Sequence, residues 1–439
     1  MMEKTPLEDW IAGIASENGA KDIARLLDWQ TERIRETIER AREASPFYKR
    51  HLAGVRLPER PEDLAELPFT SGDDVRREGL RFLCVPQGEI ARVVTLDTSG
   101  TSGPPKRFYF TRGDQDLTVE FFRHGMSVFT RPGERVLILL PCRREGSVGD
   151  LLHTALHRLG AVPVKHGVVQ SLPETLDTIE AQRIDALVGI PAQVNALARY
   201  AAAADRPVRL KNVLLSTDHV PEAVAANVAA RFGCEVFGHY GMTEMGLGGG
   251  VECRAHAGYH AFAADIVFEV VDPVSLRPVP DGETGEVVVT TLRRRGMPLI
   301  RYRTGDVSRI LPGACPCGSS LLRLERLTRR LDAGVRVGPE ELHLCDLDEA
   351  LFSLPGLLDF TAIVSGPEKK RLRLHAAVLD IPFAPDADAV ALAASGVGAI
   401  ARAVEDGFLA VETDVEKVLD WVQMHAGKRR IFCEEGEQR

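Results

Sequence analysis

Residues 136–140 read Val-Leu-Ile-Leu-Leu, and this apolar run opens the stretch that decides the fold. Two similar runs follow, Ala186 to Val188 and Val213 to Leu215, and helical stretches such as 150–159 and 222–232 alternate with them. Apolar runs of this length are typical of strands buried in a parallel sheet, and the helices serve as crossover connections. The stretch therefore predicts an α/β fold with a mostly parallel sheet.

The pattern changes twice toward the C-terminus. Between residues 262 and 311, IVFEVVD and GEVVVTTL flank the turn-rich PVPDGETG, and DVSRIL follows, which predicts antiparallel β structure. After about residue 333, the sequence predicts a helix at 347–354, the strands FTAIVSG and RLRLHAAV, and an Ala-rich helix at 389–404. We therefore expect a large N-terminal domain over 1–328, with a β subdomain, and a small mobile α+β domain over 333–439.

Residues 20–43 predict an amphipathic helix that packs on something larger. Its apolar residues recur at helical spacing among charged ones. They are Ile23, Leu26, Leu27, Ile34 and Ile38.

Composition excludes several classes of protein. Of 439 residues, 44% are hydrophobic and 27% charged, which is enough apolar material for a large core. Lys and Arg number 54 against 63 Asp and Glu, a net charge of −9, so we expect no nucleic-acid partner.

No run approaches the ~18 apolar residues of a membrane span. We expect a cytoplasmic protein whose eight cysteines are mostly free thiols.

Residues 97–106 read Asp-Thr-Ser-Gly-Thr-Ser-Gly-Pro-Pro-Lys. Two glycines, four hydroxyl residues and a lysine can wrap backbone N–H groups, hydroxyls and an ammonium around phosphate oxygens. The segment is not a Walker loop, because GxxxxGK[ST] is absent. The alternative is a polar surface loop.

Two later segments add further candidate chemistry. Residues 238–246 read Gly-His-Tyr-Gly-Met-Thr-Glu-Met-Gly, in which the ring can stack on a base and the carboxylate can hold Mg²⁺. Residues 299–306 read Leu-Ile-Arg-Tyr-Arg-Thr-Gly-Asp, and a carboxylate at this turn can accept both ribose hydroxyls. The alternatives are a glycine-rich turn with a capping Glu244 and a turn capped by Asp306.

In this order the three segments resemble the adenylate-forming superfamily of acyl-CoA synthetases and nonribosomal peptide adenylation domains, and most of all the phenylacetate–CoA ligase family. The resemblance covers nearly the whole chain. It is carried also by ASPFYKRHL, PEDLAELPFTSGDDVRREG, ARVVTLDTSGTSGPPK, VECRAHAGYH, MPLIRYRTGDVSRIL, CPCGSS, ERLTRRLD and HAGKRRI.

The resemblance implies an AMP-forming acid–thiol ligase. A carboxylic acid, expected to be aryl or arylacetic, would react with ATP to give an acyl-adenylate and pyrophosphate, after which CoA would displace AMP. Two alternatives stay open. One is an adenylating enzyme with another acceptor, namely a carrier protein, an amine or a cofactor carboxylate. The other is a nucleotide-binding sensor without turnover. A homodimer also stays open.

The same resemblance assigns residue roles. The catalytic set would be Lys428, Thr243 and Glu244, with Glu244 binding Mg²⁺, although Lys428 also lies in a charge run typical of a solvated tail. Asp332 would be the hinge of the small domain. The implied ATP-binding residues are Thr98, Ser99, Gly100, Thr101, Ser102, Gly103, Lys106, Asp218, Tyr240, Gly241, Tyr302, Asp306 and Arg330.

A separate group combines Cys253, His260, Cys315 and Cys317. Thiolates and imidazole are ligands of tetrahedral Zn²⁺, and four of them would close its coordination sphere, as in a structural site. Their spacing alone favours buried free thiols. Similar residues in the resembled family favour zinc, and His260 matches that pattern better than His256.

The sequence departs from the resembled family at three points. Pro339 stands where a glycine-bearing loop would approach the pantetheine of CoA, and proline has a fixed φ and no N–H. Ala333 replaces the second hinge acid, and Pro104 replaces a lysine of the phosphate loop. Adenylation is therefore expected more firmly than CoA transfer, and the pocket for the acid is expected to draw on Pro141, Cys142, Gly189, Ile190 and 246–250.

Overall fold

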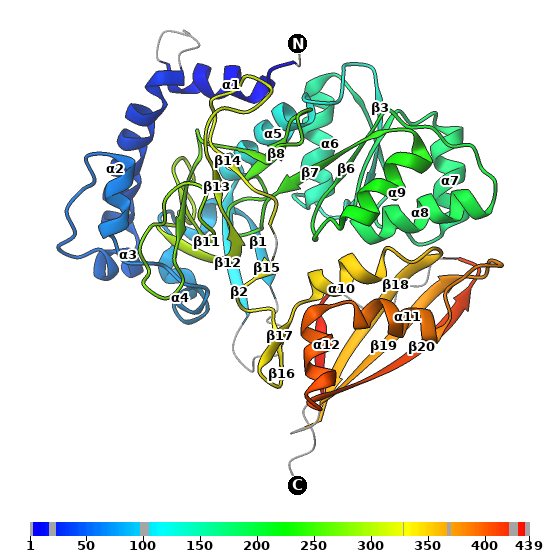
Figure 1. Cartoon of the computed structure of the whole chain (residues 1–439). Helices are drawn as coiled ribbons and strands as arrows, with labels where there is room; N and C mark the ends of the chain where they lie inside the picture. Colours follow the sequence, from blue (N-terminus) through cyan, green and yellow to red (C-terminus); the bar gives the residue numbers. More distant parts are fainter. Residues whose placement is uncertain are drawn as a thin grey trace. The chain divides into compact units, whose positions relative to one another are not determined.

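The computed structural model describes residues 3–16, 23–96, 105–327, 329–366, 370–420 and 429–434. The chain forms two compact units (Figure 1). The first unit comprises Met1–Pro132, Arg143–Ala161 and His239–Leu327. The second unit comprises Gly133–Cys142, Val162–Gly238 and Thr328–Arg439.

A parallel sheet forms the first part of the second unit. Its strands pair in the order β7-β6-β5-β3-β4, every pair being parallel. The alternation that starts at Val136 predicted this architecture, and the prediction is confirmed. The strands are β3 (Arg135–Leu139), β4 (Val162–Lys165), β5 (Ala186–Gly189), β6 (Asn212–Leu215) and β7 (Glu235–Tyr240), and the helices are α7 (Leu172–Ala181), α8 (Pro191–Ala203) and α9 (Glu222–Phe232).

The second part of this unit is the expected α+β region. β18 and β19 form an antiparallel hairpin, and β20 and β21 extend it as parallel neighbours. Helices α11 and α12 lie on one face of this sheet (Figure 1). The elements are β16 (Val335–Val337), β17 (Glu340–Leu342), α10 (Leu344–Leu351), β18 (Leu357–Ser365), β19 (Lys370–Leu379), α11 (Ala387–Ser395), α12 (Gly398–Glu405), β20 (Leu409–Val418) and β21 (Ile431–Glu434).

The prediction of a single Ala-rich helix over 389–404 is wrong. The segment forms α11 and α12, whose axes differ by 94°. Gly396 and Gly398 flank the break, and glycine costs a helix about 1 kcal/mol relative to alanine. Across the described residues no unbroken helix has both the length and the apolar character that a membrane span requires.

Antiparallel sheets form the first unit, as predicted for residues 262–311. β10, β11 and β12 pair in that order, and β13, β14, β9 and β8 form a second antiparallel set. β1 and β2 form a hairpin. The strands are β1 (Ile90–Leu96), β2 (Lys106–Thr111), β8 (Gly250–Glu252), β9 (Tyr259–Ala261), β10 (Ile266–Val271), β11 (Gly285–Thr291), β12 (Tyr302–Ser308), β13 (Ile310–Leu311) and β14 (Arg323–Leu324), and the short β15 (Arg329–Arg330) follows in the second unit.

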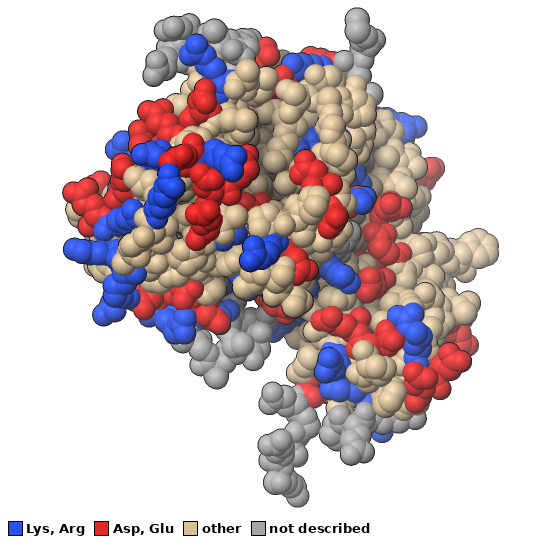
Figure 2. Space-filling view, turned by 60° about the vertical axis from the view of Figure 1, so that its left-hand side comes forward, with Lys and Arg blue, Asp and Glu red and all other residues tan. Residues whose placement is uncertain are grey.

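The helices of the first unit surround these sheets. The predicted helix over 20–43 is confirmed from Ile23 onward as η1 and α2, with Ile34 and Ile38 fully buried but Leu27 57% exposed. The helices are α1 (Pro6–Ala15), η1 (Ile23–Arg25), α2 (Leu26–Ala44), α3 (Pro46–His51), η2 (Pro61–Glu66), α4 (Gly72–Glu78), η3 (Gly79–Phe82), η4 (Gln87–Glu89), α5 (Arg112–Met126) and α6 (Val148–Leu159). Acidic and basic side chains are intermixed on the face drawn in Figure 2.

Strand β7 belongs to both units. Through Gly238 it pairs with β6 in the parallel sheet, and from His239 it pairs with β8. The loop that follows Tyr240 therefore starts at the carboxyl end of a buried parallel strand. In open α/β sheets that end of a strand is where ligands bind.

Candidate active site

Lys106 and Glu244 form an ion pair in the first unit. Nζ of Lys106, the first residue of β2, lies 2.9 Å from Oε1 of Glu244 in the loop after β7. Their side chains are 16% and 6% exposed, so water screens the pair poorly. The structure thus brings the predicted phosphate lysine to the predicted magnesium carboxylate. Residues Thr98, Ser99, Gly100, Thr101, Ser102 and Gly103 lie outside the described residues.

The loop around Glu244 is held from several sides. Nη1 of Arg294 donates to the backbone oxygen of Glu244, and the Arg294 guanidinium lies over the ring of Phe110, 4.2 Å from its centroid. A Cβ at Gly241 would overlap the carbonyl oxygen of Leu247, so only glycine fits there. Thr243 accepts a backbone hydrogen bond from Gly246 at 3.0 Å. These contacts fix the backbone of the loop that carries Glu244.

Tyr240 and Asp306 lie in direct contact. The Tyr240 hydroxyl donates to Oδ2 of Asp306 at 2.9 Å, and both side chains are buried. The backbone N–H of Asp306 donates to Oγ1 of Thr304 at 3.0 Å, which fixes the turn that carries the carboxylate. The residues predicted to contact adenine and ribose are therefore neighbours, although 66 positions separate them in the sequence.

Tyr302 is also at this site. Both its hydroxyl and the Lys106 side chain approach Gly72, the first residue of α4, where a Cβ would lie 3.5 Å from the hydroxyl and 3.7 Å from Nζ. The segment before α4 pairs with the strand of Tyr302, because Thr70 donates to the Arg301 carbonyl and accepts from the N–H of Arg303. Sequence reasoning missed Gly72, and also Arg294 and Arg301.

Arg301 is the largest fully buried side chain of the chain's described part. Its guanidinium pairs with Glu269 at 2.9 Å and donates to the carbonyls of Ala65 and Leu67 at 3.0 and 2.6 Å. These contacts tie β12 to β10 and to the segment before α4. Its place inside Ile-Arg-Tyr-Arg-Thr-Gly-Asp was the one available signal for a structural role beside β12.

Three other predicted residues lie in the second unit. Asp218, in the loop after β6, accepts from the backbone N–H of His219 at 3.0 Å. Arg330, the last residue of β15, pairs at 3.2 Å with Asp332, which lies between β15 and β16. Asp332 is 71% exposed, as a residue in a linking segment is expected to be. Lys428 lies outside the described residues, and Arg429 after it lies within them.

Cys253, His260, Cys315 and Cys317 converge in the first unit, and their donor atoms all lie within 4.8 Å of one another. The sulfurs of Cys253 and Cys315 are 3.6 Å apart, as are Sγ of Cys317 and Nε2 of His260. Four ligands at about 2.3 Å from a tetrahedral Zn²⁺ would be separated by about 3.8 Å, so the donor set fits this ion. His256 instead faces Glu252 at 3.4 Å, so His260 is the imidazole of the cluster.

Burial sets the charge state of this cluster. It raises the pKa of the Cys253 and Cys315 thiols and lowers the pKa of His260 to about 4. Burial would also raise the pKa of Cys317, but hydrogen bonds from the backbone of Thr5 and Ser319 lower it overall. An imidazole that stays neutral is ready to ligate, whereas the Cys253 and Cys315 thiols need a cation to become thiolates. Nδ1 of His260 has no hydrogen-bond partner in the described structure.

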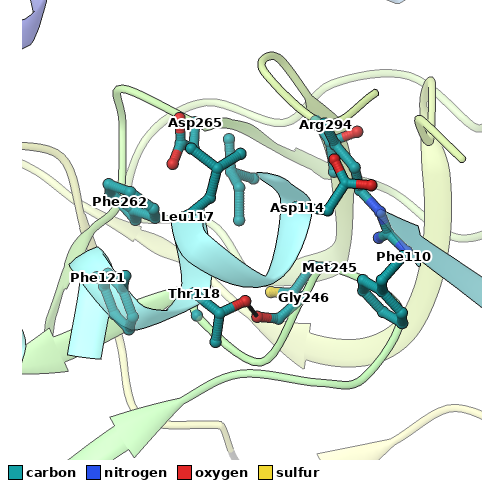
Figure 3. Close-up of a pocket in the computed structure, with 13 residues that line it drawn as sticks. Phe110, Asp114, Leu117, Thr118, Phe121, Met245, Gly246, Phe262, Asp265 and Arg294 are labelled. Carbon is teal, nitrogen blue, oxygen red and sulfur yellow. Dashed lines mark hydrogen bonds between the residues drawn. The ribbon is translucent and has the colours of Figure 1, made fainter. Parts of the chain in front are cut away.

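A small cavity of ≈ 30 Å³ lies next to the Glu244 loop (Figure 3). Thr118 donates to the Gly246 carbonyl at 2.7 Å on one side of it. Benzene requires about 150 Å³, so this cavity does not accommodate an aromatic acid. It is lined by Phe110, Asp114, Leu117, Thr118, Phe121, Met245, Gly246, Gly248, Phe262, Asp265, Ile266, Thr291 and Arg294.

Comparison with known proteins shows which enzymes the chain resembles. The family described as AMP-binding enzyme matches residues 93–292. The phenylacetate–coenzyme A ligase of Thermus thermophilus is 28% identical over 356 residues, covering 77% of this chain and 78% of that protein. The enzyme of the same name from Escherichia coli is 27% identical over 341 residues, covering 73% and 76%.

Solved structures share the fold. A 2-hydroxyisobutyryl-CoA ligase in the postadenylation state, in complex with 2-HIB-AMP, superposes with a TM-score of 0.77 at 22% identity, covering 92% of this chain and 88% of that chain. The same ligase with 2-HIB-AMP and CoA, in the thioesterification state, gives a TM-score of 0.66 at 23% identity over 94% and 91%.

Proposed function

We propose that the chain is an adenylate-forming AMP-binding enzyme of the phenylacetate–CoA ligase family, and that it joins a carboxylic acid to CoA with ATP. A carboxylate oxygen attacks the α-phosphorus of ATP, and pyrophosphate leaves as the acyl-adenylate forms. The thiol of CoA then loses its proton, its sulfur attacks the acyl carbonyl, and AMP leaves. The adenylate is needed because a free carboxylate is a poor acyl donor.

The observation that carries this proposal is a pair of contacts in the first unit, the Lys106–Glu244 ion pair and the Tyr240–Asp306 hydrogen bond, each of which joins two of the predicted ATP-binding residues. A carboxylate must approach a triphosphate, so the site needs cations to offset the repulsion. Lys106 supplies one on the phosphates, together with the hydroxyls and N–H groups of 98–103. Glu244 holds Mg²⁺, a hard cation that prefers oxygen ligands. Asp306 receives the ribose hydroxyls, and Tyr240 contacts adenine.

Further residues supply the remaining groups. Lys428 bridges the substrate carboxylate and the α-phosphate, and Thr243 contacts that phosphate. Asp218 faces the edge of adenine. Asp332, exposed beside Arg330, is the hinge between a domain over 1–328 and a mobile domain over 333–439. The acid is aryl or arylacetic, in keeping with the named substrate of the relatives in Thermus thermophilus and Escherichia coli.

A panel of carboxylic acids tests the proposal through pyrophosphate release, with and without CoA. Release that depends on one acid, together with AMP and a CoA thioester only when CoA is added, supports both steps. If no acid of an aryl, arylacetic and short aliphatic panel releases pyrophosphate while ATP still binds, the chain is a sensor and the proposed catalysis is wrong.

A second candidate is transfer to an acceptor other than CoA. β16 and β17 are joined by Gly338 and Pro339, with Val337 paired to Glu340. Gly338 has φ +65°, and the ring of Phe408 occupies the space of a Cβ there, while Pro339 offers no N–H. This turn stands where the family loop for pantetheine is expected. Pyrophosphate release without a CoA thioester, but with an acyl-amine or acyl-carrier product, would favour this candidate.

Zinc completes the proposal. Cys253, His260, Cys315 and Cys317 hold one Zn²⁺ in a closed site, which stabilises the β8–β9 segment against the loop before β14 and leaves no position for substrate. None of the eight cysteines forms a disulfide in the structure, which is in keeping with a reducing compartment, and we place the enzyme in the cytoplasm. Metal content of the purified protein tests the zinc assignment.

A further inference from the structure

Arg429, the residue after Lys428, is a buried cation in the second unit. Nη1 donates to Oδ1 of Asp348 at 2.6 Å and Nε donates to Oδ1 of Asp359 at 3.1 Å. The three side chains are 8%, 1% and 3% exposed. The guanidinium also faces the rings of Phe352 and Phe360, whose centroids lie 5.0 and 4.6 Å from Cζ. Two carboxylates and two rings therefore fix one side chain.

The partners of Arg429 belong to regular elements. Asp348 is in α10, Asp359 is in β18, and β18 pairs directly with β21, which starts at Ile431. Burial lowers the pKa of Arg429, but the charges of Asp348 and Asp359 raise it above its usual value, so the cation persists. Charged pairs of this kind are strong only when both partners stay buried and in place.

The helix that holds Asp348 is itself bound to the loop of Asp218. Glu349, the next residue, accepts from Nε2 of His219 and from the N–H of Glu222, both at 3.0 Å. The Arg199 guanidinium donates to the carbonyls of Phe352 and Leu354 just after α10. The anchor of Arg429 is thus fixed relative to the loop predicted to face adenine.

From these contacts we propose that Arg429 is a positioning residue for Lys428, which deepens the proposed function and rests on it. Consecutive Cα atoms are about 3.8 Å apart, so an immobilised Arg429 limits the positions that are open to the Cα atom of Lys428. The lysine must bring its ammonium to the point where carboxylate and α-phosphate meet. A misplacement of about 1 Å at such a point costs about 10²-fold in rate. Arg429 touches no substrate and acts through Lys428 alone.

The test compares Arg429→Gln with Arg430→Gln in both half-reactions. Arg430 is the matched control, since it is exposed and its guanidinium faces only the ring of Phe432 at 4.9 Å in the described structure. Arg429→Gln is expected to lower acid-dependent pyrophosphate release about 10²-fold. Thiol transfer from a presynthesised acyl-adenylate is expected to stay within about 2-fold per folded molecule, because Lys428 is not needed there. Equal losses in both half-reactions would overturn the proposal.

The same variant in a Lys428→Ala background gives a sharper result. If Arg429 acts through Lys428, Arg429→Gln adds no further loss once the lysine is gone. A full multiplicative loss would show that Arg429 acts by another route. If Lys428→Ala by itself leaves pyrophosphate release unchanged, the lysine has no catalytic role. The proposed positioning role of Arg429 is then wrong as well.

Two further measurements keep the proposal testable apart from activity and folding. Digestion with a Lys-specific endoproteinase is expected to cleave after Lys428 faster in Arg429→Gln than in wild type or Arg430→Gln, whether or not any acid is turned over. Unchanged cleavage would contradict the anchor. If Arg429→Gln does not fold, the triple variant Asp348→Asn/Asp359→Asn/Arg429→Gln replaces it, because it leaves no buried charge unpaired. The triple variant must also lose acid-dependent pyrophosphate release while it keeps thiol transfer from the acyl-adenylate.

Discussion

The ammonium of Lys106 lies 2.9 Å from the carboxylate of Glu244. The side chain predicted to bind the phosphates of ATP and the side chain predicted to bind Mg²⁺ therefore neutralise each other's charge. If Lys106 binds a phosphate and Glu244 binds Mg²⁺, as proposed, each side chain exchanges its contact with the other for a contact with Mg·ATP. Each event releases the partner for the other, and the free energies of the two events are therefore linked.

The first prediction tests this pair through stability. Lys106→Met leaves a buried carboxylate unpaired, and loss of one partner of a buried pair costs about 3–5 kcal/mol. Lys106→Met/Glu244→Gln is expected to regain most of that loss. Urea unfolding of wild type, both single variants and the double variant gives the coupling energy. Strictly additive effects would show that the two side chains do not interact in solution.

Asp306→Ala is expected to weaken ATP binding. The ribose would lose charge-assisted hydrogen bonds worth about 1.5–3 kcal/mol, which raises the Kd by about 10–150-fold. Titration calorimetry with ATP measures the change. Asp281→Ala, at an exposed turn between β10 and β11, is the matched control and should leave the Kd unchanged. Equal ATP affinities of wild type and Asp306→Ala would show that Asp306 does not bind the ribose of ATP.

Lys428→Ala is expected to lower adenylation by about 10²–10³-fold, the effect of losing one transition-state donor. Consumption of a presynthesised acyl-adenylate by CoA should change little, because the carboxylate and phosphate no longer have to be brought together. Single-turnover assays of the two half-reactions make the comparison. A similar loss in both would assign the lysine a structural role.

Metal removal is expected to lower stability more than catalysis per folded molecule. The protein should contain about one zinc per chain, and Cys315→Ser should lose it together with several degrees of Tm, because metal binding is linked to folding. Cys433→Ser, at an exposed thiol, is the control and should keep both. Unchanged metal content and Tm in Cys315→Ser would identify the four residues as free thiols and a buried histidine.

The His219–Glu349 contact predicts a pH dependence of stability. Burial lowers the pKa of His219, but the hydrogen bond to Glu349 and the charges of Asp348, Glu349 and Asp218 raise it above 6.5 overall. A raised pKa means that protonation favours the folded state, so the stabilisation is present below about pH 6.5 and is lost at higher pH. His219→Gln keeps a donor without the charge. The difference in unfolding free energy between wild type and this variant should shrink as pH rises above 6.5, and a constant difference would contradict the assignment.

The hydrophobic pattern was sufficient to predict the parallel sheet from the sequence, because strands that are buried on both faces appear as apolar runs such as 136–140. It was not sufficient for 389–404, where Gly396 and Gly398 interrupt a composition that otherwise favours one helix. Leu27 shows the same limit, since helical spacing does not reveal which part of an apolar stripe the fold covers.

Contacts between distant segments were the least accessible to sequence reasoning. Tyr240 and Asp306 were each singled out, but nothing in their spacing predicted the hydrogen bond between them. Arg294 and Arg301 act through carbonyls and carboxylates supplied by other segments, so neither stands out in its own neighbourhood. The Cys/His cluster was predicted because ligand chemistry is visible in residue type, even when 57 or 62 positions separate the partners.

The N-terminal helix has a consequence for synthesis of the chain on the ribosome. Oε2 of Glu8, in α1, accepts from the hydroxyl of Ser319 and the N–H of Ser320, 311 and 312 positions later. At about 5–20 residues per second, roughly 15–60 s pass between translation of the two segments. Until then the carboxylate of Glu8 has Lys4 beside it but lacks these two donors, and α1 cannot complete its packing beside the loop that holds Cys315 and Cys317. Helix α1, which precedes the other described helices of its unit in the chain, is therefore among the last parts of that unit to become native.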